Sequence, residues 1–236
     1  MKIIELIKKA KINFNKDQGY KSKSYKNINK RKNEKDLDSS SVEVFGLRRI
    51  QGDISSKSLN LKGYSKISGD IDTEIFKLKG VTKIMGNNFI KDYLKGFGSL
   101  FIIKNLKCRL FNFKGELSTD GDIYCESFSF DISDPSFAKN IISNNIEIKN
   151  KRKDIIGKEN TLKKFMQKRE DKNILKCDYI EGKDIFIENT HVNKVKGENI
   201  KVGRGCVIGS LEYSDEVIID KDSIVRNMTL AENFKR

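Results

Sequence analysis

A short motif recurs along the chain at a nearly constant interval. It consists of a glycine, five residues and a second glycine that Asp or Asn follows. Its copies begin at Gly46, Gly63, Gly80, Gly115 and, in degraded form, Gly96. Taken in chain order, the leading glycines follow one another at intervals of about 17 residues. Pairs of apolar residues keep the same period, at 59/61, 76/78, 111/113 and 128/130. A fixed period predicts one structural unit that stacks on copies of itself.

The repeated unit is predicted to consist of short β-strands. Apolar and polar residues alternate within it, and Gly, Asp and Asn separate the runs, as is typical of strands and turns. One period is too short for two helices and a turn, but at about 3.3 Å per residue it suits about three strands and their corners. Stacked parallel strands give each backbone amide a partner. The sequence therefore predicts an all-β fold, a single-stranded parallel β-helix with Leu, Ile and Phe inside.

Glycines and acidic residues mark the corners of this coil. We expect ten glycines to be structural: Gly46, Gly52, Gly63, Gly69, Gly80, Gly86, Gly115, Gly121, Gly182 and Gly197. Asp53, Asp70, Asn87 and Asp122 share one phase, so their side chains could form a column that binds calcium. Because calcium needs six or more converging oxygens, a role in turn geometry is favoured, and no metal site is predicted.

The chain divides into one elongated domain with two tails and an insertion. Residues 1–41 form a basic tail, with an amphipathic helix at 2–14 and a disordered linker after it. Residues 42–150 form the first part of the coil and residues 174–230 the second, with eight or nine turns in total. A charged loop at 151–173 interrupts the period, and residues 231–236 form a C-terminal tail.

The positive charge lies largely outside the repeats. The net charge is +14. Residues 1–41 carry 12 basic and 5 acidic side chains, and residues 151–176 carry 10 and 4, which leaves +1 for the rest of the chain. Nucleic acid is therefore not a predicted partner, because that function needs a basic stripe on the folded surface.

The N-terminal tail is a candidate for membrane contact. Ile3, Ile4, Leu6 and Ile7 lie largely on one helical face, with lysines around the other. Such a helix could lie on an anionic membrane, dock on the coil, or stay unstructured. No apolar run approaches the length that a transmembrane helix needs. Without a secretion signal and with four scattered cysteines, the expected location is the cytoplasm, at most peripheral to the inner face of the cell membrane.

No catalytic constellation is visible. Cys108 and Cys125 are one period apart and are expected to stack as small buried residues. A disulfide or metal site is conceivable, but two thiols alone do not complete a zinc site. His191 is the single histidine and is expected at a surface or turn. The prediction is a non-enzymatic protein without cofactor or small-molecule substrate.

A family resemblance lies in the repeats and, after a gap, in residues 180–190 and 195–213. These segments resemble the bactofilins, and most closely their larger cytoplasmic members in Gram-positive bacteria. The resemblance covers about residues 42–225, whereas the tail and the loop at 151–173 depart from it. It implies a right-handed β-helix and a polymer-forming cytoskeletal scaffold. Such proteins assemble end to end into nonpolar filaments without nucleotide, and some attach to membranes through N-terminal tails. It brings no catalytic residues.

The ends of a β-helix also predict self-assembly on physical grounds. Each open end exposes unpaired strand edges and apolar interior, which must be capped or paired. The expected interface comprises Val44, Phe45 and Leu47 at the front and Val217, Ile219 and Ile224 at the back. The partner would then be a second copy of the chain.

Two other functions compete with the scaffold. Left-handed β-helix acyltransferases are built from hexapeptides, with an aliphatic residue at every sixth position. Here six-residue steps from Ile50 reach Ser56 and Lys62, so the hexapeptide pattern fails. An adhesin or carbohydrate-binding coil is disfavoured because no secretion signal is present.

Overall fold

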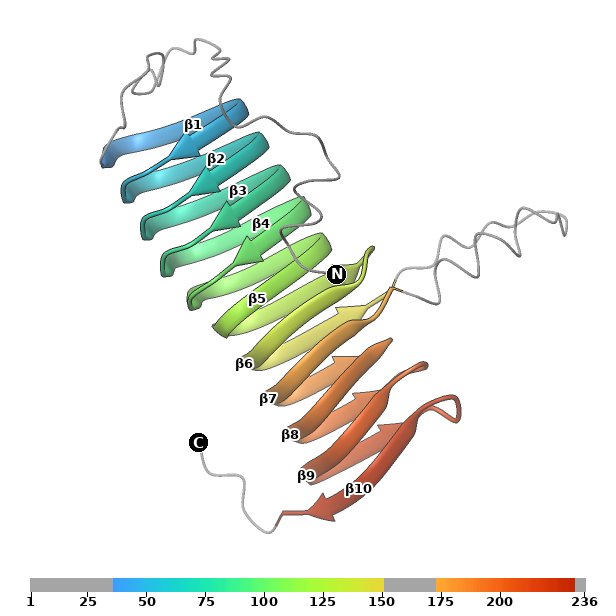
Figure 1. Cartoon of the computed structure of the whole chain (residues 1–236). Coiled ribbons are helices and arrows are strands. Elements are labelled where there is room, and N and C mark those ends of the chain that lie inside the picture. Colours follow the sequence, from blue (N-terminus) through green and yellow to red (C-terminus); the bar gives the residue numbers. More distant parts are fainter. Residues whose placement is uncertain (1–35, 151–172, 232–236) are drawn as a thin grey trace, which may run out of the picture.

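The computed structural model of the chain describes residues 36–150 and 173–231. These residues form ten strands and no helix (Figure 1). The strands are β1 (Leu37–Ile50), β2 (Ile54–Ile67), β3 (Ile71–Ile84), β4 (Asn88–Ile102), β5 (Leu106–Ile132), β6 (Ser136–Lys149), β7 (Leu175–Ile187), β8 (Thr190–Val202), β9 (Val207–Ile219) and β10 (Ile224–Leu230). Each pairs in parallel with the next, in chain order. The predicted all-β parallel coil is confirmed, with about ten turns where eight or nine were expected.

Each turn has three sides, which β2 illustrates. Residues 54–56 form the first side, residues 58–62 the second and residues 64–67 the third. The pairing with β1 skips Lys57, Gly63 bends the chain with φ at 110°, and residues 68–70 close the turn. Register partners on successive turns therefore form columns that run along the rod.

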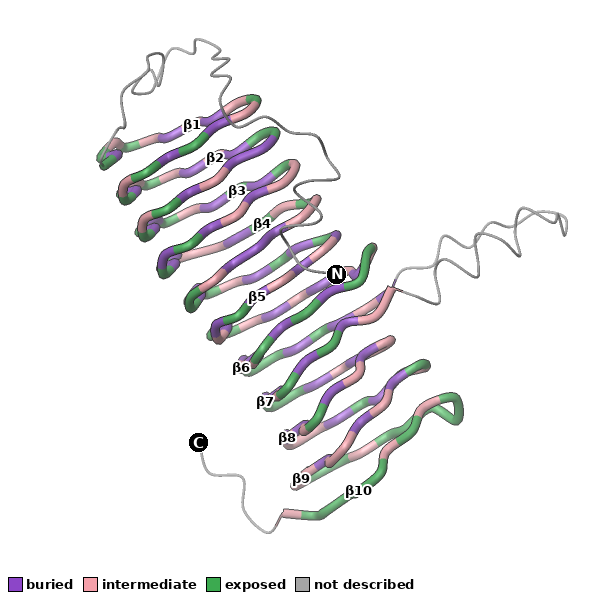
Figure 2. The backbone as a smooth tube through the Cα atoms, in the orientation of Figure 1, coloured by how far each residue is buried: buried purple, intermediate pink, exposed green. Residues whose placement is uncertain are grey.

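The core is a set of such columns inside the rod. Buried positions alternate with more exposed ones along β1 to β8, whereas β10 has no buried position (Figure 2). Phe111 stacks on Phe128 with ring centroids 4.6 Å apart and nearly parallel planes, and Phe113 lies 6.5 Å from Phe130 in the same way. The apolar pairs that set the period in the sequence are thus the interior of the coil.

The fourth turn corrects one expectation. Gly98, not Gly96, aligns with Gly80 and Gly115, and its φ is 121°. A bulge between Ile90 and Tyr93 inserts one residue, so the turn is longer and its corner glycine comes later. Gly96 instead occupies an interior position, where a Cβ would lie 2.4 Å from the carbonyl oxygen of Leu78.

The break between successive strands changes corner along the rod. From β1 to β4 the breaks fall at the Gly-Asp corner, whereas from β6 onward they fall at the corner that carries the positive-φ glycines in the first turns. β5 spans this change, which explains its 27 residues. The described chain stops at Asn150 and resumes at Asn173 at the second corner, where Asn150 Nδ2 donates to the Asn173 carbonyl at 3.4 Å.

The coil begins earlier than its composition predicted. β1 starts at Leu37, whereas the disordered linker was expected to extend to residue 41. Leu37 is buried, and Ser39 and Ser41 pair with Ser56 and Ser58 of the next turn. Backbone pairing and one apolar anchor therefore order a serine-rich stretch whose composition is typical of a polar linker.

Candidate functional site

The C-terminal end of the rod exposes the interior of the coil. Four apolar residues finish columns that are buried higher up, and we call them the C-terminal end face: Val217, Ile219, Val225 and Met228. Met228 is 52% exposed, whereas its register partner Leu211 is 0% exposed. Ile219 is 38% exposed, whereas Val202 above it is 1% exposed. The next turn, which would cover these side chains, is absent from the described chain.

The backbone at this end is open as well. β10 is the last strand of the sheet and pairs with β9 alone among the described residues. Ile224 and Leu230, on β10, are both more than half exposed. Ile224 pairs with Val207, which is at a partly exposed position of the third side, so Ile224 borders the end face. An edge of this kind is a template for pairing with another strand.

The predicted interface residues are thus placed differently at the two ends. Val217, Ile219 and Ile224 lie at or beside the end face. Val44 is 2% exposed and points into the first turn, so it is not an accessible contact residue. Phe45 and Leu47 are partly exposed. The end face also includes Val225 and Met228, which the sequence analysis missed, although each lies one period after a core residue, Ile208 or Leu211.

The predicted membrane residues Ile3, Ile4, Leu6 and Ile7 lie outside the described residues. The described residues include no helix that is long and apolar enough to span a membrane.

The acidic column at the Gly-Asp corner serves the backbone. The Oδ1 atom of Asp70 accepts the amide of Asn87 at 2.7 Å, and Oδ1 of Asp53 accepts the amide of Asp70 at 2.7 Å. Asp36 and Asn105 extend this ladder in the same way, and their spacing of one period to Asp53 and Asp122 could have identified both. The described residues contain no cluster of three or more His, Cys, Asp or Glu side chains suited to a metal ion.

The second glycine of each motif makes room for this ladder. A Cβ on Gly69 would lie 2.3 Å from Oδ1 of Asp53 and 2.4 Å from the carbonyl carbon of Gly52. Gly86 meets the turn before it equally closely. Gly182 and Gly197 also pair with each other, but they lie inside the coil, where a Cβ would approach Ile185. Close packing of turns therefore requires glycine at the Gly-Asp corners and at these two interior positions.

Cys108 and Cys125 lie within hydrogen-bonding distance and are both free thiols. Their mutual hydrogen bond raises the pKa of Cys108, to which burial adds, and lowers the pKa of Cys125. Burial raises the pKa of Cys177 to about 12 and that of Cys206 to about 11. The two thiols of the first pair are neighbours as predicted, but only Cys108 is buried and Cys125 is partly buried. Cys108, Cys177 and Cys206 are protonated core residues.

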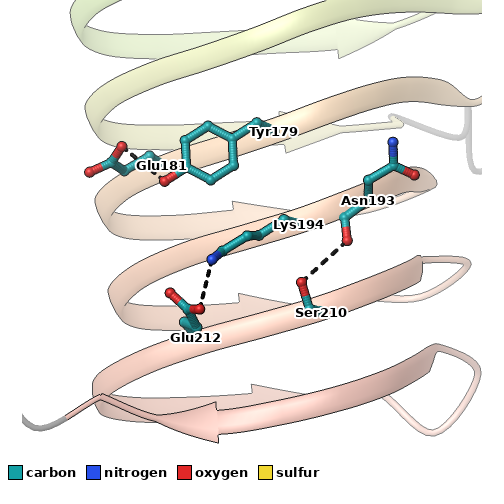
Figure 3. Close-up of polar contacts among 6 residues, drawn as sticks. All are labelled: Tyr179, Glu181, Asn193, Lys194, Ser210 and Glu212. Carbon is teal, nitrogen blue, oxygen red and sulfur yellow. Dashed lines mark hydrogen bonds and ion pairs between the residues drawn. The ribbon is translucent and has the colours of Figure 1, made fainter.

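His191 and its surroundings form a polar surface without a catalytic arrangement. Burial and the neighbouring Lys176 lower the pKa of His191, which lies on β8 and is partly exposed. On another side of the same turns, Tyr179 donates to Glu181 at 3.0 Å and Lys194 pairs with Glu212 at 2.7 Å (Figure 3). These contacts run along or between neighbouring strands and do not converge on one point.

A groove of about 470 Å³ lies on the second side, across β5 to β9. Phe186 lies in it, with the amines of Lys149 and Lys201 at 5.7 and 5.8 Å from its ring centroid. On its rim, Asn199 donates to Asp184 at 2.8 Å. The described residues that line the groove include neither His nor Cys, so its chemistry is that of a mixed polar and aromatic surface.

Comparison with known proteins identifies no family. No family model matches the chain, and no solved structure matches it. One stretch is 36% identical over 58 residues to an uncharacterized protein, YhbF, of Bacillus subtilis (strain 168). The match covers 25% of this chain and 25% of that protein, so the chain spans about a quarter of the length of this relative.

Proposed function

We propose that this protein is a non-enzymatic scaffold that assembles with copies of itself through the C-terminal end face. The exposed interior columns carry the proposal. Met228 and Ile219 are accessible at positions whose equivalents in every turn above are buried or nearly so. A β-solenoid is compatible with a polymer-forming scaffold and also with a β-helix enzyme, and the open end favours the scaffold.

The energetics of this end favour association. Full burial of a Met or Ile side chain contributes about 1.5–3 kcal/mol. About half of that remains to be gained here, because Ile219 is 38% and Met228 is 52% exposed, and pairing of β10 satisfies its free edge. Val44 and Leu37 are already buried at the opposite end, so that end offers less apolar surface. A contact between two C-terminal end faces would be self-complementary, as in a two-fold dimer.

The resemblance to bactofilins extends this proposal to filaments. We infer that further contacts at the N-terminal end, at Phe45 and Leu47, join such pairs into nucleotide-independent polymers in the cytoplasm. The N-terminal tail would attach them to a membrane. Each of these two steps has its own test below.

Electron microscopy and sedimentation velocity of the full chain without nucleotide would test the proposal. The test variants are Ile219→Arg and Met228→Arg, and the matched control is Ile218→Arg. Ile218 neighbours Ile219 on β9 and is 49% exposed, but it pairs with Lys201 on the outer surface. We expect assemblies in the wild type and the control. In the test variants we expect the dissociation constant of self-association to be at least tenfold higher.

Monodisperse monomers in every sample would contradict self-assembly. Assemblies that resist both end-face substitutions but dissolve in Phe45→Arg would place the contact at the N-terminal end instead.

A further inference from the structure

Five lysines are gathered on one side of the upper half of the rod. They are outward residues of the second side in β2 to β5: Lys62, Lys77, Lys79, Lys95 and Lys114. All five are exposed. We call this surface the lysine face.

The register places these lysines in two adjacent columns. Lys77 pairs with Lys95 in one column, and Lys62 pairs with Lys79 in the other. Phe97 separates Lys79 from Lys114 in the second column. Neighbours on paired strands are about 4.8 Å apart, so the face holds like charges at close spacing over several successive turns of the rod.

No carboxylate within the described part of the chain forms an ion pair with these lysines. The same columns carry Asp131 and Glu147 in lower turns, where Glu147 pairs with Lys149. Glu43 stands at the top of one column and interacts with Asn60. The positive charge of the lysine face is therefore not neutralised by the coil itself.

Aromatic rings lie among the lysines. The amine of Lys62 is 4.8 Å from the ring centroid of Phe45, and that of Lys79 is 5.7 Å from the centroid of Phe97. Phe97 is 54% exposed. Lysines beside exposed aromatic rings are the combination that suits the headgroup region of a bilayer.

We propose that the lysine face binds the surface of an anionic lipid bilayer, so that the rod lies side-on against the membrane. Charge complementarity and shape favour this occupant. The two columns run beside each other along one side of the rod, so a planar surface can reach both at once, whereas a curved nucleic-acid duplex would touch only a strip of them. Single-stranded bases need free ring faces for stacking, and lysine amines already lie over the rings of Phe45 and Phe97.

The distribution of the remaining charge agrees with this orientation. Asp36, Asp53 and Asp70 lie at the Gly-Asp corner, between the first and third sides, away from the lysine face. The small net charge of the coil is therefore the sum of a strongly basic side and an acidic corner. This contact does not depend on self-assembly, since each chain carries the whole face.

The test is co-sedimentation of the full chain with vesicles of phosphatidylcholine, with and without about 30% phosphatidylglycerol. The test variant is Lys77→Gln/Lys79→Gln/Lys95→Gln. The matched control is Lys104→Gln/Lys107→Gln/Lys139→Gln, which removes the same charge from exposed lysines on other parts of the coil. Each lysine near an anionic leaflet strengthens binding about fivefold, so we expect the test variant to bind roughly a hundredfold more weakly and the control to lose less than tenfold.

Three variants and one competing ligand decide which part of the chain binds and what it binds. Equal losses in the test variant and the control would overturn the proposal, because net charge alone would then explain them. Binding that survives in the test variant but disappears in Ile4→Asn/Leu6→Asn would assign the contact to the N-terminal tail. Tighter binding to a single-stranded oligonucleotide, lost in the same lysine variant, would assign the face to nucleic acid. Wild-type binding that persists on neutral vesicles or at about 0.5 M salt would also contradict an electrostatic contact.

Discussion

At the scale of single residues, the corners of the coil decide how closely successive turns approach. Gly63, Gly80, Gly98 and Gly115 form one column in which each backbone has positive φ. A side chain at any of them would meet the carbonyl of the turn above. These glycines are therefore needed both for their conformation and for the space that a missing Cβ leaves.

Replacement of Gly98 tests this requirement. In Gly98→Ala the Cβ would lie 1.9 Å from the carbonyl oxygen of Gly80, in addition to the unfavourable φ. We expect a loss of about 1–3 kcal/mol, seen as a lower urea midpoint by circular dichroism. The control is Gly203→Ala, where the Cβ would meet the flexible Glu188 side chain first, at 2.7 Å, and should lose less than about 1 kcal/mol. Equal midpoints for the two variants would show that the corner can relax.

At the scale of an element, β5 joins two halves of the rod with different corners. Its two successive turns stack Phe111 on Phe128 and Phe113 on Phe130. These four rings fill the interior where the position of the loop changes from one corner to the other. Continuity of the core therefore lies in the aromatic columns, while the corners vary around them.

Truncation of one ring in this stack measures its contribution. Phe111 is 1% exposed, so Phe111→Ala leaves a cavity between Leu94 in the turn above and the stacked ring of Phe128, and we expect a loss of about 3–5 kcal/mol. The comparison is Phe89→Ala, in the neighbouring turn, where the ring is 42% exposed and less than half of that loss is expected. Thermal and urea unfolding of both variants would be compared with the wild type. Similar unfolding of the two would mean that the stack contributes little beyond surface packing.

At the scale of the whole molecule, each turn depends on its neighbours alone. Every strand pairs with the preceding and following strand in chain order, so stability is a sum of local interfaces. In the same architecture the C-terminal end is open and several lysines lie together on one side. Assembly through the end and membrane contact through the side use different surfaces, so one rod has room for both.

Replacement of the segment at 151–172 tests whether the stability of the coil depends only on contacts between neighbouring turns. β6 and β7 pair directly on either side of it, and Asn150 contacts Asn173 where the chain leaves and returns. Replacement of residues 152–172 by Gly-Ser is expected to keep the β-sheet spectrum and shift the thermal midpoint by less than about 4 °C, because β6 and β7 pair with each other directly and do not need these residues for their register. Loss of cooperative unfolding in this variant would show that the insertion contributes to the core.

The amino-acid sequence was enough to predict the period, the strand class, the parallel stacking and the residues of the interior. These follow because a fixed repeat places chemically similar side chains at equivalent positions of every turn. It could not locate the bulge at residues 91–92 that moves the corner from Gly96 to Gly98, since an extra residue can be absorbed anywhere in a turn. It also could not distinguish the buried front at Val44 from the exposed back at Met228. Only the folded coil shows which apolar columns end uncovered and which lysines share a side. The net charge and mean hydropathy of a sequence do not say on which side of the coil a side chain lies.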